Sequence, residues 1–223
     1  MEAYDKFTKE IFNFTYCSAF IIFFIIKGGY FLLFFLLSVF FLTNYELFSV
    51  FNNKAIILFL DLILILSLYS IYYLADDIVR FHLLLWIIIL VICSDVGGYT
   101  FGKIFRWKKL TKISPKKTLS GVFGSFIFSL SSIFIADTIL QKNLDVNIKS
   151  SINFLEPKFF FLAIMLSLVA QIGDLTISYF KRIEKIKDAG KILPGHGGIL
   201  DRIDGLMFVV IVTFILIQIN IIP

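Results

Sequence analysis

Long apolar runs separated by short polar segments constrain the fold of this chain more than any other feature. A helix that crosses the hydrocarbon core of a bilayer needs about 20 predominantly apolar residues. Runs that approach or reach this length lie at residues 11–26, 29–44, 55–75, 81–101, 119–140, 158–180 and 205–222. A short Lys-Gly-Gly segment joins the first two, which form either a tilted hairpin or one span with an interfacial segment. We therefore expect an all-α, polytopic transmembrane helical bundle of about seven spans, within a range of six to nine.

The composition points to the same class of protein. Of the 223 residues, 59% are hydrophobic and 28 are phenylalanine, which leaves too little polar surface for a soluble domain. No repeat or linker divides the chain, so we expect a single integral-membrane domain, residues 1–223, with a catalytic half at approximately 90–205. Cys17 and Cys93 both lie in apolar runs, which argues against a disulfide or a zinc site.

The basic residues indicate how the chain is oriented. Of 21 lysines and arginines, the segment Lys103–Lys117 holds seven and the segment Lys181–Arg202 holds six. Two expected spans separate these segments, so both face one side, and the positive-inside rule makes that side cytosolic. The N-terminus is then cytosolic too. The rule also explains the net charge of +5, so no nucleic-acid partner is expected. Frequent Phe, Ile, Lys and Asn suggest an AT-rich bacterial genome, and hence a bacterial inner membrane.

The stretch from Asp174 to Asp204 is too rich in charge to be only a membrane filler. Before the glycines, polar residues recur at helical spacing and form one stripe on an otherwise apolar helix: Gln171, Asp174, Ser178, Lys181 and Lys185. Such a polar stripe must face protein or water. Next comes the turn Pro-Gly-His-Gly-Gly, whose glycines leave backbone N–H groups exposed to an anion. Asp201 and Asp204 follow, one helical turn apart. An ordinary cytosolic loop with helix-capping aspartates is the alternative, but the whole arrangement favours a site for metal ions and phosphates.

A second polar segment runs from Ser94 to Gly121. Asp95 falls near the cytosolic end of an expected span, and the glycines after it allow close approach of a neighbouring helix or a ligand. The sequence Ser-Pro-Lys-Lys-Thr at 114–118 places two lysines and two hydroxyls just before a helix, an arrangement suited to holding phosphate. A solvated basic turn is the alternative for this piece taken alone.

These two segments together resemble a known family. The residues Ser178, Lys181, Arg182, Lys187, Asp188, His196, Gly197, Gly198, Asp201, Arg202 and Asp204 are similar in identity and spacing to the signature of the CDP-diglyceride synthases, also called phosphatidate cytidylyltransferases. The earlier segment matches through Asp95, Gly102, Ser114, Pro115, Lys117, Thr118 and Gly121. Two positions depart from the family pattern: Ser120 stands where a glutamate or larger polar residue is usual, and Ser125 where glycine is common. The resemblance covers about the last sixty per cent of the chain, with Glu46 as a faint further match.

The resemblance implies a nucleotidyltransferase of phospholipid biosynthesis that condenses CTP with phosphatidate and releases pyrophosphate. Asp174 and Asp201, at the ends of two apolar runs, are the expected metal ligands, with Asp204 as a third. The expected catalytic residues are Lys181, Arg182, Lys187, Asp188, His196 and Arg202. The expected substrate-binding residues are Asp95, Ser114, Lys116, Lys117, Thr118, Ser178, Gly197 and Gly198. His196 either donates a proton to pyrophosphate or is a neutral structural residue.

The expected cofactor is Mg²⁺, which prefers oxygen ligands and substrate phosphates, and the resemblance alone implies a second cation, K⁺. The expected partners are CTP, phosphatidate and membrane lipids, with a homodimer as a possible assembly. The alternatives are a cation-coupled secondary transporter and another membrane lipid phosphotransferase. Asp61 lies inside an apolar run, and for it we favour a structural partner or an interfacial position over a functional role.

Overall fold

The computed structural model describes residues 24, 27–111, 114, 117–140, 152–186, 189–190 and 197–222. In these residues the regular secondary structure is helical, apart from one isolated bridge between Lys109 and Thr118. The helices are α2 (Gly29–Val50), α3 (Lys54–Asp76), α4 (Ile78–Phe105), α5 (Leu119–Leu140), α7 (Pro157–Ile183) and α8 (Leu200–Gln218). The expected all-α class is therefore confirmed for the described part of the chain.

Five of these helices, α2, α3, α4, α5 and α7, are long and apolar enough to cross a membrane. They coincide with the expected runs from 29–44 to 158–180. The run at 205–222 corresponds to α8, which begins earlier, at Leu200, and carries Asp201 and Asp204 in its first turns. The run at 11–26 lies outside the described residues, apart from Phe24.

Helix α2 continues past residue 44 to Val50, because the polar residues in its last turns have partners within the bundle. Asn44 Nδ2 donates a hydrogen bond to Asp61 Oδ1 of α3 over 3.0 Å. This bond gives Asp61 the structural partner that we favoured. Glu46, one half-turn later, is 1% exposed and faces the other helices.

Side chains at the helix starts explain several boundaries. Asn53 accepts a hydrogen bond from Ala55 N at the start of α3, and Asp77 accepts from Val79 N and Arg80 N at the start of α4. Thr118 Oγ1 accepts from Gly121 N at the start of α5. Each bond satisfies an N–H group that has no partner inside its own helix.

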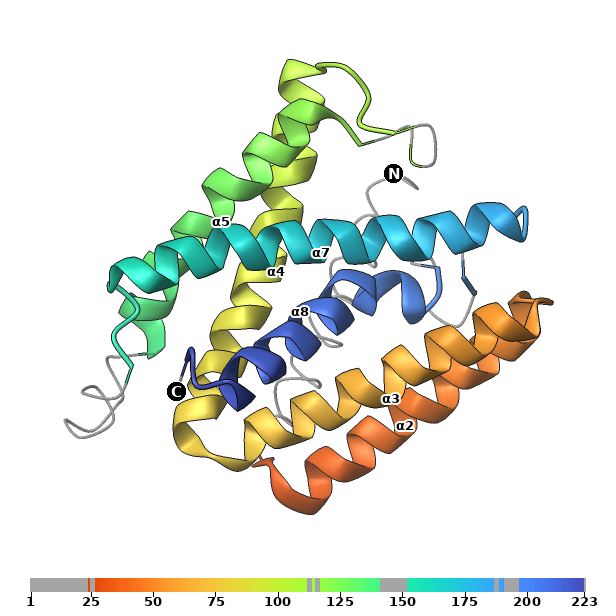
Figure 1. Cartoon of the computed structure of the whole chain (residues 1–223), viewed down its shortest axis with the longest axis horizontal. Helices are drawn as coiled ribbons and strands as arrows, with labels where there is room; N and C mark the ends of the chain where they lie inside the picture. Colours follow the sequence, from red (N-terminus) through yellow and green to blue (C-terminus); the bar gives the residue numbers. More distant parts are fainter. Residues whose placement is uncertain are drawn as a thin grey trace, which may run out of the picture.

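Figure 1 shows α8 lying between α7 and α3, with α2 alongside α3 and α4 alongside α5, and these neighbours are in contact. Helices α4 and α5 approach closely because glycines face each other. A Cβ atom added to Gly97 would collide with the carbonyl oxygen of Gly124 and lie 2.6 Å from Phe128 Cβ. Small residues at such contacts let helix backbones pack directly, which is how helices associate in lipid.

Replacing Gly97 by valine should therefore loosen the α4–α5 pair. Overpacking of a close contact costs about 1–3 kcal/mol, so the unfolding temperature in detergent should fall by several degrees. The control is Val96→Leu on the adjacent exposed position, where the side chain is 47% exposed, and it should leave the unfolding temperature nearly unchanged. Equal shifts in the two variants would contradict this packing.

Candidate active site

The candidate site forms where the first turns of α8 cross α7. A Cβ atom on Gly173 would lie 2.6 Å from the Phe208 ring and 3.1 Å from the Asp204 carbonyl oxygen, and one on Gly205 would lie 3.2 Å from the Ala170 carbonyl oxygen. The two helices thus touch through backbone. Because Asp174 follows Gly173 and Asp204 precedes Gly205, this crossing brings the two aspartates into one region.

Asp174 is held by two of the residues that the sequence predicted for the site. Its Oδ2 lies 2.5 Å from the ammonium of Lys117, in the loop before α5, and its Oδ1 accepts a hydrogen bond of 3.3 Å from Ser178, one turn later on α7. The Asp174 side chain is 37% exposed and the Lys117 side chain 24% exposed. The pair therefore joins the segment before α5 to α7, with the ammonium nitrogen of Lys117 itself buried.

Asp201 forms a second, more deeply buried ion pair. Its Oδ1 accepts a hydrogen bond of 2.6 Å from Lys181 Nζ, and the two side chains are 15% and 10% exposed respectively. Its Oδ2 accepts from the backbone N–H groups of Ala189, at 2.8 Å, and Gly198, at 3.3 Å. The Gly198 N–H, expected to face a substrate anion, thus donates to a protein carboxylate in this structure. Gly197 has a φ of 84°, a conformation that glycine adopts at little cost.

Two further acidic side chains complete a cluster around Asp174. Asp95 on α4 and Asp204 on α8 lie close enough to Asp174 for their charges to repel it, while Lys117 attracts Asp95 and Lys181 attracts Asp204. Three helices therefore contribute carboxylates to one place, with two lysines beside them. The cluster lies among buried helices, where uncompensated charge is costly.

The carboxylates are suitable ligands for Mg²⁺, a cation that takes one or two carboxylates and completes its shell with water and substrate phosphates. Within the described residues, no three acidic, histidine or cysteine side chains form a ready-made metal cage. Carboxylates arranged in this way suit a cation that completes its shell with water and substrate phosphates.

A chain of hydroxyl groups lies among α4, α5 and α7. Ser94 Oγ and Ser167 Oγ are 2.8 Å apart, and Ser125 Oγ donates to the Ser94 carbonyl oxygen over 2.8 Å. Gln171 Nε2 donates to Ser167 Oγ at 3.5 Å. Ser125, which departs from the family pattern, is therefore part of the contact between α4 and α5.

The remaining predicted residues are spread around the cluster or fall outside the description. Arg182 Nη1 donates to the Ile186 carbonyl oxygen over 3.2 Å, and Arg202 is an exposed residue in the first turn of α8. Thr118 caps α5 and lies 3.0 Å from Ser120 Oγ, and the Ser114 carbonyl accepts from Lys117 N. Lys116, Lys187, Asp188 and His196 lie outside the described residues.

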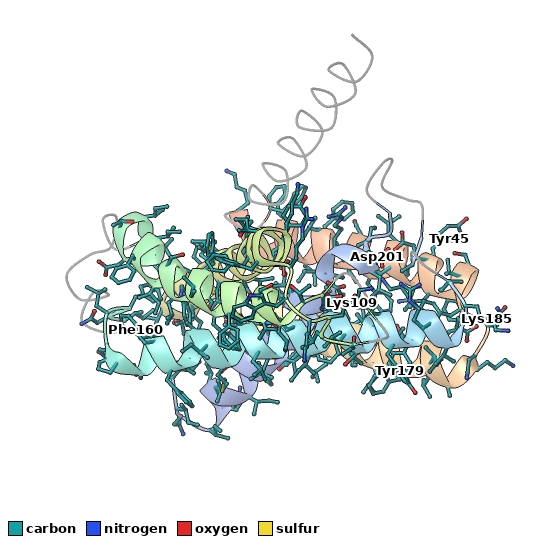
Figure 2. The ribbon with its side chains drawn as sticks, turned by 90° about the horizontal axis from the view of Figure 1, so that it is seen from above. Tyr45, Lys109, Phe160, Tyr179, Lys185 and Asp201 are labelled. Carbon is teal, nitrogen blue, oxygen red and sulfur yellow. The ribbon has the colours of Figure 1, made fainter. Side chains whose placement is uncertain are left out.

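The sequence prediction of the site omitted Glu46. Its Oε2 accepts hydrogen bonds from Ile199 N at 2.8 Å and from Leu200 N at 3.3 Å, at the start of α8. The available signal was a carboxylate within an apolar segment, together with the faint family match. Figure 2 shows Tyr45, next to Glu46, at the same end of the molecule as Lys185, with Phe160 at the opposite end.

The comparisons with known proteins agree with this picture. Residues 7–220 match the model of the Cytidylyltransferase family, so the chain belongs to that family. The phosphatidate cytidylyltransferase of Staphylococcus saprophyticus is 41% identical over 140 residues, which cover 62% of this chain and 50% of the relative. The proteins of the same name from Staphylococcus haemolyticus and Staphylococcus aureus are each 40% identical over 139 residues, 61% of this chain and 50% of theirs. The matched region spans about half the length of these relatives, and the family resemblance is confirmed.

Replacing Lys181 by methionine should destabilise the fold strongly. The substitution leaves the partly buried Asp201 carboxylate without its cation, a loss of up to about 3 kcal/mol, and should lower the unfolding temperature in detergent. Lys158→Met is the matched control, because Lys158 pairs with Glu156 at 2.7 Å between side chains that are 45% and 42% exposed. Such surface pairs contribute about 0–1 kcal/mol. A Lys158 variant as unstable as the Lys181 variant would contradict the assignment.

Proposed function

We propose that this protein is a phosphatidate cytidylyltransferase that condenses CTP with phosphatidate to give CDP-diacylglycerol and pyrophosphate. The observation that carries the proposal is the convergence of Asp95, Asp174 and Asp204 from three helices, beside Lys117 and Lys181. The names of the similar proteins support this choice of substrates. In a cation-coupled secondary transporter, ionisable groups are expected along a path through the membrane. The acidic residues here instead gather in one place beside lysines, which favours an enzyme.

In the proposed reaction, a phosphate oxygen of phosphatidate attacks the α-phosphorus of CTP in line with the departing group. A P–O bond forms, the bond from the α-phosphorus to its bridging oxygen breaks, and pyrophosphate leaves with that electron pair. Electrostatic repulsion between the two anionic substrates is the main obstacle, so positioning and charge neutralisation provide the catalysis. Lys117, Lys181, Arg182, Lys187 and Arg202 are proposed to hold the phosphates.

Mg²⁺, when bound, would neutralise part of the negative charge of the substrate phosphates. We assign Asp174 and Asp201 as its ligands, with Asp204 as a third, and include K⁺ as a second cation. Both principal ligands are paired with lysines in this structure. A bound phosphate competes for the lysine ammonium groups, which leaves the carboxylates available to a cation. The ion pairs therefore couple cation binding to phosphate binding.

The proposal places the site at the cytosolic surface of a bacterial inner membrane, in a bundle of about seven spans with a cytosolic N-terminus. The two basic segments around the cluster support this orientation through the positive-inside rule. Phosphatidate keeps its acyl chains in the bilayer, so its phosphate lies at the depth where the charged helix ends begin. CTP reaches the same depth from the cytosol. A homodimer is part of the proposal.

The test uses purified protein in mixed micelles with labelled CTP and phosphatidate, with and without Mg²⁺. The wild type should form CDP-diacylglycerol and pyrophosphate only with Mg²⁺, whereas a different product would indicate another lipid phosphotransferase.

Asp174→Asn and Asp201→Asn should each lower turnover at least about 100-fold, because each removes a charged ligand. Asp61→Asn is the control, since the amide retains an acceptor for Asn44, and it should keep near-normal turnover. Normal rates in both site variants would overturn the metal assignment.

A further inference from the structure

We propose that Glu46 is a positioning residue for the catalytic cluster, and this inference rests on the proposed function. The Glu46 carboxylate, from α2, holds the first turn of α8 and the two glycine segments next to it. It thereby fixes where Asp201 and Asp204 lie relative to Asp174. It acts through α8, by its bonds to the backbone of that helix.

The first step of the argument is the missing cap of α8. The first N–H groups of a helix have no partners within the helix, and a Ser, Thr, Asp or Asn side chain usually accepts from them. Ile199 occupies the cap position of α8 and provides no side-chain hydrogen bond. Glu46 Oε2 instead accepts from Ile199 N and Leu200 N, although the chain separation is 153 residues to the first of them.

The second step is that burial makes these bonds strong. Glu46 is 1% exposed, so its carboxylate has exchanged water for protein donors and cannot be left without them. The N-terminus of a helix carries partial positive charge, which stabilises a carboxylate placed there. The carboxylate and the start of α8 therefore depend on each other, and neither can move alone.

The third step is that glycines in the two segments before α8 leave space for the Glu46 carboxylate. A Cβ atom on Gly190 would lie 2.6 Å from Glu46 Cδ, and one on Gly198 would lie 2.9 Å from Glu46 Oε2 and 2.8 Å from Gly190 N. Any larger residue at either position would displace Glu46. Two glycines from the segments on either side of 191–196 thus pack directly on the glutamate.

The final step connects these contacts of Glu46 to the predicted metal ligands. Asp201 accepts from the N–H of Ala189, which precedes Gly190, and from the N–H of Gly198, itself one of the two glycines that pack on Glu46. Two carboxylates, Glu46 and Asp201, therefore hold the same two backbone segments. Without Glu46, the start of α8 can shift, and Asp201 and Asp204 shift with it. The loss should appear in the rate of the chemical step more than in nucleotide affinity.

The experiment compares Glu46→Ala, Glu46→Gln and Glu46→Asp in full-length protein by hydrogen exchange and by kinetics. In Glu46→Ala, amides at 198–204 should exchange at least about tenfold faster, because two charge-assisted bonds are lost, while amides in the middle of α7 stay protected. The kcat should fall at least about tenfold with little change in KM for CTP. Glu46→Gln, which keeps an acceptor, should be intermediate on both measures and remains informative if the alanine variant does not fold.

Glu184→Ala is the matched control. Glu184 also accepts two backbone N–H groups from a distant segment, Asn52 at 3.3 Å and Asn53 at 3.0 Å, but it holds the α2–α3 connection. Its loss should leave exchange at 198–204 and kcat unchanged. Uniformly faster exchange in the Glu46 variants, or unchanged exchange and kcat, would overturn the proposal. If the wild type forms no CDP-diacylglycerol, the proposed function fails, and the exchange data still decide whether Glu46 clamps α8.

Discussion

The arrangement of the candidate site depends on one partly buried carboxylate, that of Asp201. It pairs with Lys181 of α7 and accepts hydrogen bonds from Ala189 and Gly198. One side chain of α8 thereby joins three segments that are separate along the chain. Burying a charge beside apolar helices is favourable only when it has such partners. Satisfying this carboxylate, together with that of Glu46, constrains the position of α8 and with it the position of Asp204.

The helices were predictable because apolar length and helical spacing are local properties of the sequence. The runs at 55–75, 119–140 and 158–180 agree closely with α3, α5 and α7. The polar stripe through Asp174, Ser178 and Lys181 also follows from spacing on a single helix. Two of its residues meet, since Ser178 donates to Asp174, while Lys181 pairs with Asp201 of α8. The number of spans does not follow in the same way, because the run at 11–26 lies outside the described residues.

The site was less predictable, because its contacts join residues that are distant in the sequence. The glycines at 197–198 suggested free N–H groups for an anion, yet Gly198 donates to Asp201. The spacing of these glycines is compatible with N–H groups that face an anion and with N–H groups that bind a protein carboxylate. Only the surrounding fold determines which of the two occurs. Glu46 illustrates the limit best, since its partners at the start of α8 come from the other end of the chain. A carboxylate in an apolar run predicts that a partner exists but does not identify it.

The glycine contact between α4 and α5 has a consequence for how the protein holds together within lipid. Gly97 and Gly124 bring two backbones together without intervening side chains, and within lipid such an association depends on dispersion forces and not on the release of water. The α4–α5 contact should therefore form without any contribution from the release of water. Asp95, two residues before Gly97, is held in its place in the cluster by this backbone contact.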